Sequence, residues 1–393
     1  MKTYIKTFAA ALLAAGMSLT SGVQAQEGPI RIGMALSQSG NLADSAKHYW
    51  EGVELWRDKV NAEGGLLGRQ VEVVVYDDRS DAATAARLYE KLISDDKVDL
   101  LMGPWGSASS ATGAAVANKH KRIFINSGGA SEQIHERNFK YVFQTAAPIS
   151  AYVASIGPLA QKHQLKSLVF FGRDYPAARD MGKAIQQIAK DTGMDVLALE
   201  FFPAGTTDFS SLIAQARQKQ PDLWVSIGYP NEAIEMVRQM KASNYLPKVF
   251  VHNGASINDF IRAAGADSEY AFGMSLYEPS LKTEGNEWFV TEFEKRYKEK
   301  PAYYSAFSFA GATVLEHLVK SVGSLDQEKL REALTTFETK TVLGDHKVNP
   351  QTGKQEGVKG LLVQIRDGQR EIAFPEHLKT MEPEIPMPAW DKR

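Results

Sequence analysis

GPWGSASSATGAAVANKHKRIFINSGGAS, residues 103–131, is the stretch that decides the fold. A short apolar run, Asp99–Met102, precedes a turn and a helix, and a second apolar run, Arg122–Asn126, follows them. Strand, helix and strand in this order predict a βαβ unit with two parallel strands. Ligands of such sheets bind outside the carboxyl ends of the strands, so the loops after both strands are expected to form a binding crevice.

The residues of these two loops are suited to holding a small anion. Gly106 allows close approach of the backbone, and Ser107 falls at or next to the helix N-cap, where free N–H groups and the helix dipole favour negative charge. Gly128 and Gly129 add further backbone amides. The alternative is an ordinary serine N-cap followed by a turn.

The N-terminal residues MKTYIKTFAAALLAAGMSLTSGVQAQ indicate export. Lys2 and Lys6 precede an apolar run, and small residues follow, which predicts a secretory signal peptide, residues 1–25, cleaved after Ala25. No later apolar run reaches the ~18 residues of a membrane span. The chain has no cysteine, which excludes disulfides, thiolate metal sites and a lipidated N-terminal cysteine. A freely diffusing protein of a Gram-negative periplasm is therefore expected.

The charge composition does not favour a nucleic-acid partner. The formal net charge is −2, and removal of Lys2 and Lys6 changes it to −4. Charged residues of both signs make up 23% of the chain, without the strongly basic balance that a phosphate backbone requires.

Strand and helix patterns alternate along the chain after the signal peptide, which predicts an α/β fold with mostly parallel sheets covered on both faces. The chain exceeds the ~100–200 residues of one typical domain, so two doubly wound lobes facing one another across a cleft are expected. The expected strands are 29–36, 71–76, 99–102, 122–126, 167–171, 195–200, 222–227, 248–252 and 271–276. The later expected helices are 149–164, 178–192, 208–219, 231–243, 286–299, 303–322 and 325–338.

The chain is expected to cross between the lobes more than once. The N-terminal lobe should contain residues 26–147 and 277–345, and the C-terminal lobe residues 148–276 and 346–393. Hinge segments are expected near Ala147, Leu276 and the 340s. The proline-rich tail from Pro375 should wrap irregularly over the surface.

Residue patterns for catalysis or metal binding are largely missing. Asp77, Asp78 and Asp81 follow a strand and could hold a hard cation, but capping of the next helix by Asp81 or Ser80 is the preferred interpretation. The eight histidines form no HExxH or HxH spacing, and the chain has no GxSxG, Walker A or GxGxxG motif. We expect no metal, no cofactor and no enzymatic activity; a Ser/His/Asp arrangement of distant residues stays open as an alternative.

Three aromatic residues stand at strand ends. If the sheets are arranged as expected, Trp105, Tyr175 and Tyr229 converge and form an apolar wall around a small planar or branched ligand. Separate packing roles are the alternative.

Several motifs together resemble the leucine/isoleucine/valine-binding proteins, the periplasmic substrate-binding subunits of branched-chain amino acid ABC transporters. They are Arg31-Ile32-Gly33 with Ser39-Gly40, NAEGGLLGR at 61–69, Tyr76-Asp77-Asp78, and Gly103 to Ser107. The resemblance covers the whole mature chain. It implies a type I periplasmic binding fold that closes around a three-stranded hinge, and a monomer that delivers its ligand to an inner-membrane permease.

The resemblance also implies the ligand-binding residues. The ligand carboxylate should be held by the Ser107 hydroxyl and by the loop from Gly128 through Gly129 to Ser131. The usual threonine of this loop falls on Ala130, so either Ser131 has taken over its hydroxyl role or the contact is missing. Tyr175 and Tyr229 match cleft-lining tyrosines of the second lobe, and Ser45 and Asn253 complete the expected set.

This sequence departs from the family at the ligand ammonium group. The two acidic positions of amino-acid-binding members fall on Ile149 and Asn253, and a buried ammonium without a carboxylate partner loses ~3–5 kcal/mol. We therefore expect a carboxylate ligand with an aromatic or branched body and no amine. An alignment shift, or a nearby acid such as Asp174, would restore a hydrophobic amino acid; a periplasmic sensor subunit is the alternative of another class.

Overall fold

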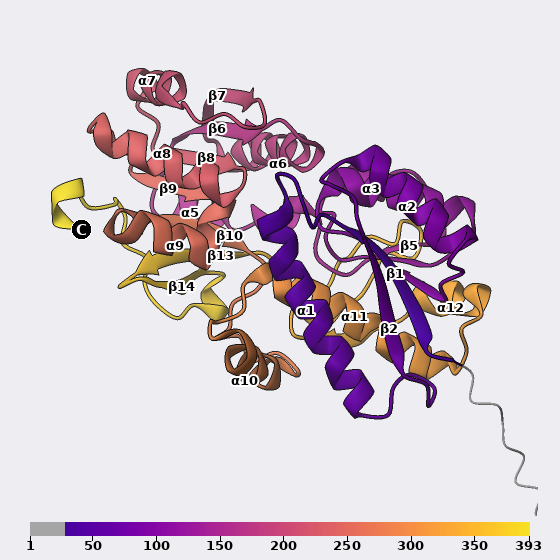
Figure 1. The fold of residues 1–393 in the computed structure, drawn as a ribbon. Helices are drawn as coiled ribbons and strands as arrows, with labels where there is room; N and C mark the ends of the chain where they lie inside the picture. Colours follow the sequence, from indigo (N-terminus) through magenta and orange to yellow (C-terminus); the bar gives the residue numbers. More distant parts are fainter. Residues whose placement is uncertain (1–27) are drawn as a thin grey trace, which may run out of the picture.

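The computed structural model describes residues 28–393, so the predicted signal peptide lies outside the described part of the chain. Two α/β lobes stand side by side, each built on one sheet with helices on both faces (Figure 1). The predicted fold class is confirmed. Within the described residues, no helix has the length and apolar character needed to cross a membrane.

The first lobe contains a five-stranded parallel sheet in the order β2-β1-β3-β4-β5. Strand β1 lies inside this sheet between β2 and β3 and is buried except at Arg31, which explains the mainly apolar run from Ile30 to Leu36. The strands are β1 (Ile30–Leu36), β2 (Val71–Asp77), β3 (Leu100–Met102), β4 (Phe124–Asn126) and β5 (Val142–Gln144).

Helices α2 and α3 cover one face of this sheet, and α1 and α11 pack together on the other (Figure 1). Tyr49, Val53 and Trp56 lie on the apolar face of α1 and are fully buried. The indole N–H of Trp56 donates to Glu316 of α11 at 2.8 Å. The helices are α1 (Ala43–Ala62), α2 (Ala82–Ser94), α3 (Ser107–Lys119), α10 (Asn286–Tyr297), α11 (Tyr303–Val322) and α12 (Gln327–Leu334).

The second lobe contains a seven-stranded sheet in the order β14-β13-β10-β9-β8-β6-β7. Five strands are parallel, and β13 and β14 form an antiparallel hairpin at one edge. The strands are β6 (Ser167–Arg173), β7 (Asp195–Phe202), β8 (Leu223–Ile227), β9 (Val249–His252), β10 (Phe272–Ser275), β13 (Leu361–Arg366) and β14 (Gln369–Phe374). The sequence analysis did not predict this hairpin, although Asp367 and Gly368, both with positive φ, form the kind of two-residue turn that signals one.

The predicted single helix over 149–164 is wrong. The structure has two short helices, α4 (Ile149–Tyr152) and α5 (Ile156–Lys162). Pro158 explains the break, because its ring would clash with the carbonyl of Ala154 in a continuous helix, whereas proline is accepted in the first turn of a new one. The other helices of this lobe are α6 (Pro176–Thr192), α7 (Ser210–Lys219), α8 (Pro230–Ala242) and α9 (Asn258–Ala264).

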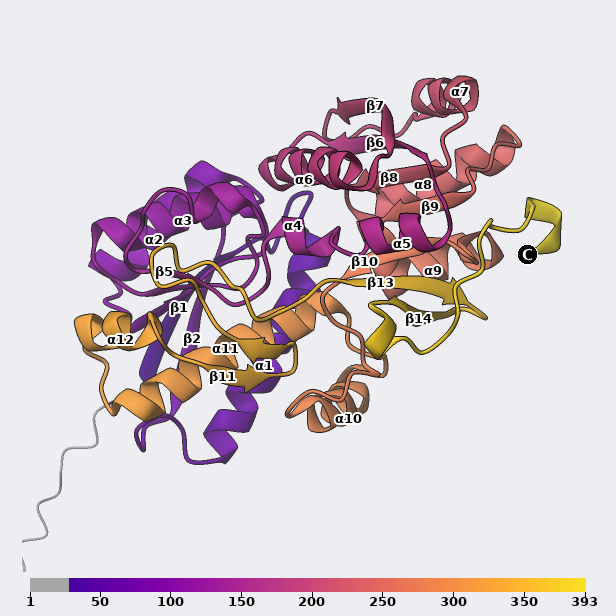
Figure 2. The ribbon, with the colours of Figure 1, turned by 180° about the vertical axis from the view of Figure 1, so that it is seen from behind.

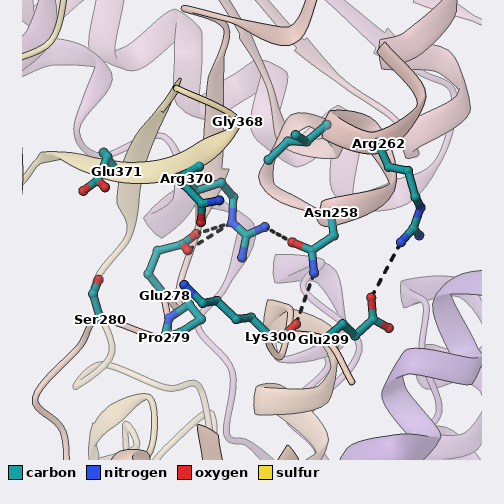
Figure 3. A pocket seen from close by; sticks show the side chains of 12 residues that line it. Asn258, Arg262, Glu278, Pro279, Ser280, Glu299, Lys300, Gly368, Arg370 and Glu371 are labelled. Atoms are coloured by element: carbon teal, nitrogen blue, oxygen red, sulfur yellow. Dashed lines mark hydrogen bonds and ion pairs between the residues drawn. The ribbon is translucent and has the colours of Figure 1, made fainter. Parts of the chain in front are cut away.

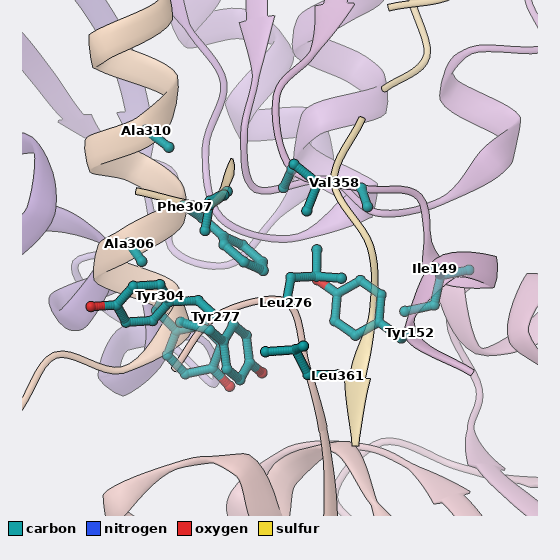
Figure 4. Close-up of a cluster of buried hydrophobic side chains, with 14 of the residues drawn as sticks. Ile149, Tyr152, Leu276, Tyr277, Tyr304, Ala306, Phe307, Ala310, Val358 and Leu361 are labelled. Carbon is teal, nitrogen blue, oxygen red and sulfur yellow. The ribbon is translucent and has the colours of Figure 1, made fainter. Parts of the chain in front are cut away.

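Three crossings of the chain meet between the lobes in an apolar cluster (Figure 4). Ile149 and Tyr152 belong to the first crossing, Leu276 and Tyr277 to the second, and Val358 and Leu361 to the third. The side chain of Phe307 from α11 reaches into the same cluster.

The third crossing lies later in the chain than predicted. Strands β11 (Thr339–Thr341) and β12 (Gly344–His346) precede a segment that still contacts the first lobe. The carbonyl of Gly353 accepts from the Gln144 amide at 2.8 Å, and the Gln355 side chain donates to the Thr145 carbonyl at 3.0 Å. The chain therefore enters the second lobe near Val358, not in the 340s.

The C-terminal tail runs irregularly over the second lobe, as predicted (Figure 2). Its Met387 amide donates to the carbonyl of Lys248 at 2.9 Å. The Trp390 indole donates to the carbonyl of Tyr245 at 3.0 Å.

Candidate functional site

A cavity of about 40 Å³ lies between the lobes, where strands of both sheets end. The first lobe contributes Trp105, Gly106, Ser107, Gly128, Ala130, Tyr303 and Tyr304. The second lobe contributes Tyr175, Ala177, Tyr229 and Asn253, and the first crossing contributes Ile149 and Tyr152. The strand ends of two sheets thus meet at one enclosed space, as expected for parallel sheets.

Helix α3 begins at the cavity without a side-chain cap. Gly106 is the N-cap residue with φ +100°, a conformation that favours glycine, and Ser107 is the first helical residue. Among the described residues, the backbone amides of Ser107, Ala108 and Ser109 have no acceptor. The first turn also has no acidic residue. This helix end therefore retains its positive partial charge for an anion.

The Ser107 hydroxyl is not a helix cap, so the alternative considered for this residue is wrong. Its oxygen accepts a hydrogen bond from the Ser131 amide at 3.2 Å. The hydroxyl hydrogen of Ser107 remains available to donate into the cavity that the residue lines.

The second loop presents its backbone to the same cavity. A Cβ atom on Gly128 would lie 2.2 Å from the Pro104 carbonyl oxygen, so only glycine fits there. Within residues 28–393, the amides of Gly128 and Ala130 have no acceptor. Together with the free amides at the start of α3, these two amides provide hydrogen-bond donors at the same cavity.

Gly129 and Ser131 do not line the cavity, in contrast to the prediction. The Gly129 amide donates to the Asn126 side chain at 2.9 Å. The Ser131 hydroxyl donates to Asp180 of α6 at 2.6 Å. Ser131 therefore has not taken over the family's threonine role, and Ala130 lines the cavity without a hydroxyl.

Trp105, Tyr175 and Tyr229 line one cavity, as the sequence analysis expected. The rings of Tyr175 and Tyr229 are stacked at 6.0 Å between centroids with an interplanar angle of 18°. They occupy the N-cap positions of α6 and α8. Trp105, from the first lobe, packs edge-on against Tyr304 at 4.3 Å.

Three further cavity tyrosines, Tyr152, Tyr303 and Tyr304, were missed by the sequence analysis. The analysis considered only loops after strands, whereas these residues lie in the first crossing and at the start of α11. Pro301, followed by two aromatic residues at the start of a long apolar helix, was the available signal.

Ser45 supports the cavity from behind. The residue is buried, and its hydroxyl interacts with the Tyr304 hydroxyl and lowers the pKa of this tyrosine against the larger effect of burial, which raises it. It is not among the residues that line the cavity. The predicted direct role of Ser45 in ligand binding is therefore replaced by the positioning of Tyr304.

The positive partial charge at the N-terminus of α8 is already balanced by a buried acid. The Glu232 carboxylate accepts from the Tyr229 amide and from Arg173 at 3.1 Å. The Arg173 guanidinium in turn lies 4.7 Å from the centre of the Tyr229 ring. Burial raises the pKa of Glu232, and the amide of Tyr229 and the charge of Arg173 oppose this rise. An anion is therefore better placed at α3 than at α8.

Ile149 and Asn253, the positions where the family resemblance implies acids, both line the cavity. The Asn253 side-chain oxygen accepts from the Gly228 amide at 2.9 Å, so its NH₂ group remains free to face a ligand. Asp174 pairs with Arg179 at 2.7 Å and is not among the lining residues. In the described part of the chain, no acidic side chain lines this cavity.

The aspartates after β2 serve local structure, in agreement with the preferred interpretation. Asp81 is the N-cap of α2 and accepts from the Thr84 amide at 2.7 Å. Asp78 accepts from the Ser37 hydroxyl at 2.6 Å.

A larger cavity, about 510 Å³, lies beside the second crossing and is lined by charges of both signs (Figure 3). The guanidinium of Arg370 donates to buried Glu278 at 3.0 Å, and Arg262 faces Glu299 at 3.8 Å. Burial raises the pKa of Glu278, and Arg370 opposes the rise. Because Arg370 with Glu278 and Arg262 with Glu299 are paired within it, this cavity offers less to a small ligand than the aromatic one.

Two hinged α/β lobes that enclose a small cavity at their strand ends define a solute-binding protein. Residues 29–369 match the family model described as periplasmic binding protein, and the chain belongs to this family. The family is one of binding proteins and not of enzymes, which agrees with the expectation that this chain is not an enzyme.

Individual proteins show the same relationship. The Leu/Ile/Val-binding protein homolog 7 of Brucella abortus (strain 2308) is 23% identical over 389 residues, covering 94% of this chain and 97% of the relative. The leucine binding protein LivK of Thermotoga maritima matches with a TM-score of 0.79 at 22% identity, over 87% of this chain and 97% of the other. A solute-binding protein of R. palustris in complex with benzoate matches with a TM-score of 0.79 at 21% identity, over 90% and 100%. These structural matches support the fold.

Proposed function

We propose that this protein captures, in the periplasm, a carboxylic acid with an aromatic or branched body and no amino group, and delivers it to the permease of an ABC importer. One observation carries the proposal. The uncapped start of α3, with the Ser107 hydroxyl, opens into a cavity that has tyrosine walls and, among the described residues, no acidic side chain.

The carboxylate of the ligand is assigned to the donors of the first lobe. Free amides at a helix start, a free hydroxyl hydrogen and the two loop amides of Gly128 and Ala130 all suit a carboxylate. Each hydrogen bond to such a charged group is worth ~1.5–3 kcal/mol. Several together are sufficient to orient a small anion.

The proposed ligand has no amino group because the residues across the cavity from the carboxylate donors do not suit one. Ile149 is apolar, and the free group of Asn253 is a donor that an ammonium group cannot use. A buried ammonium left without an anionic partner loses ~3–5 kcal/mol, equivalent to two to three decades of affinity.

The body of the ligand is assigned to the aromatic residues. Tyr175 and Tyr229 present stacked rings from one lobe, and Trp105 and Tyr304 present an edge-on pair from the other. Such walls suit a flat ring or a compact branched chain. The benzoate complex of the R. palustris protein is one example of such a ligand in this fold.

A hydrophobic amino acid is the second candidate, and the names of the relatives favour it. Both the Brucella relative and the Thermotoga structure are described as binding proteins for branched-chain amino acids. This candidate needs an ammonium partner that the described cavity walls do not contain.

Thermal-shift measurements with matched ligand pairs test the proposal. The pairs are 3-phenylpropionate with phenylalanine and 4-methylpentanoate with leucine, because the two members of each pair differ by one amino group. The acid at 100 times its Kd should stabilise the protein by about 2.7 kcal/mol, and the amino acid should have little effect. Stabilisation by leucine or phenylalanine alone would contradict the proposal and favour the second candidate.

A further inference from the structure

We propose that Asp180 is a positioning residue that fastens the second lobe onto the anion-binding loop of the first, so that closure of the lobes completes the ligand site. This inference rests on the proposed function only in placing the ligand carboxylate at Ser107. Asp180 is not among the residues that line the cavity, and it therefore acts through its neighbours.

Asp180 makes hydrogen bonds across the boundary between the lobes. It belongs to α6 of the second lobe and is 4% exposed. One carboxylate oxygen accepts from the Ser131 hydroxyl at 2.6 Å and from the Glu132 amide at 3.0 Å. The other accepts from the Gln133 side chain at 3.4 Å. All three donors belong to the first lobe, directly after the loop that contains Gly128 and Ala130.

Ser131 connects Asp180 to the anion site. Its hydroxyl is held by Asp180, while its amide donates to the Ser107 oxygen at 3.2 Å. With this lone pair of Ser107 occupied, its hydroxyl hydrogen is directed away from Ser131 and can serve the ligand. The second lobe thereby orients a ligand-binding hydroxyl that it does not itself touch.

The charge of Asp180 makes this contact sensitive to closure. The cation next to it, Lys183, lies 3.5 Å away and its side chain is 72% exposed, so it contributes little. A buried carboxylate needs strong donors, and here the three donors come from the opposite lobe. When the lobes separate, Asp180 loses all three of these hydrogen bonds, and water takes their place.

Loss of this contact should lower affinity through the population of the closed state. The apparent Kd equals the intrinsic Kd divided by the fraction of binding-competent protein, so a less stable closed state weakens binding without removing any ligand contact. Because the contact forms after encounter, its loss should appear in the dissociation rate.

The test compares Asp180→Ala and Ser131→Ala with the control Asp174→Asn. Asp174 precedes the same helix but pairs with Arg179 inside the second lobe. Binding is measured by calorimetry and stopped flow with two probes, benzoate and leucine. Both variants should lose affinity through faster dissociation, Asp180→Ala by tenfold to a hundredfold and Ser131→Ala by no more than that. The double variant should lose no more than Asp180→Ala alone, and the control should bind like the wild type.

Closure is measured separately, so that the outcome does not depend on the ligand. Because the chain has no cysteine, spin labels can be placed at Arg137→Cys and Gln186→Cys, one exposed position on each lobe. Asp180→Ala should shift the distance distribution towards the open state, whereas urea unfolding of the ligand-free protein should change little. If the wild type binds leucine and not benzoate, the proposed ligand class fails while this test proceeds with leucine. Unchanged distances and unchanged affinity in Asp180→Ala would overturn the assignment of this residue.

Discussion

His48 on α1 and Asp259 on α9 face each other across the boundary between the lobes, with 3.6 Å between the imidazole Nε2 and the carboxylate Oδ2. The other ring nitrogen lies 3.0 Å from Glu51, and the carboxylate of Glu299 is close to the same cluster. The cations nearby are Arg262, which pairs with Asp259, and Lys300. Burial alone lowers the pKa of His48, but the hydrogen bonds and charges of Asp259 and Glu51 outweigh it and raise this pKa to about 9.

The stability of the closed protein should therefore depend on pH through His48. Since its pKa lies above the value of 6.5 for a free imidazole, the stabilisation is complete below pH 6.5 and is lost as the pH rises through about 9. After allowance for partial solvent screening, we expect a loss of ~1–2 kcal/mol. Urea unfolding of wild type and His48→Gln with saturating ligand, at pH 6 and pH 9.5, measures this loss. A constant difference between the two proteins at both pH values would contradict the prediction.

Ser107→Ala should weaken ligand binding more than it weakens folding. The variant removes the hydroxyl assigned to the ligand carboxylate, which should cost ~1.5–3 kcal/mol, or tenfold to somewhat over a hundredfold in Kd. It also removes the acceptor of the Ser131 amide, at ~1 kcal/mol of stability.

The matched control for Ser107 is Ser110→Ala, which removes a buried hydroxyl of the same helix bonded to the Pro104 carbonyl at 3.1 Å. This control should lose stability but not affinity. Calorimetry and urea melts on both variants separate the two effects. Equal affinities for Ser107→Ala and wild type would move the anion site away from α3.

Asn253→Asp should turn the ligand preference towards amino acids. The aspartate retains the acceptor for the Gly228 amide and introduces a carboxylate into the cavity, where an ammonium group would find a partner. Affinity for leucine should rise about tenfold or more, ~1.4 kcal/mol, and affinity for 4-methylpentanoate should fall. Calorimetry with leucine and 4-methylpentanoate measures this reversal of ligand preference. If leucine gains nothing, Asn253 does not lie at the ligand's amine position.

Ligand binding should make the molecule more compact. The chain crossings converge on one apolar cluster, so the lobes can rotate about it while each sheet stays intact (Figure 4). The hydrogen bond between Ser131 and Asp180 and the ion pair between His48 and Asp259 should form as the lobes close. Solution scattering with and without saturating ligand measures the radius of gyration. An equal radius in both states would argue against a hinged cleft.

Much of the fold could be predicted from the sequence because its signals are local. Helix α11 has the bounds expected from its apolar face, between Pro301 and Gly323, and Asp81 caps α2. Periodicity and capping depend on residues within a few positions of one another, so they can be recognised without the tertiary structure. The break before α5 and the hairpin at Asp367-Gly368 were also local signals, and they were missed.

The sequence by itself determined that two parallel-sheet lobes would place polar, glycine-rich loops and aromatic residues at their strand ends. Only the tertiary structure decided which of these groups face the cavity. Ser131 and Asp180 are 49 positions apart, and their contact diverts a hydroxyl that had been expected to bind the ligand. The contact of Trp105 with Tyr304 depends equally on how α11 returns to the first lobe. Such contacts depend on the relative position of distant segments and on closure of the lobes, and no pattern of neighbouring residues specifies these.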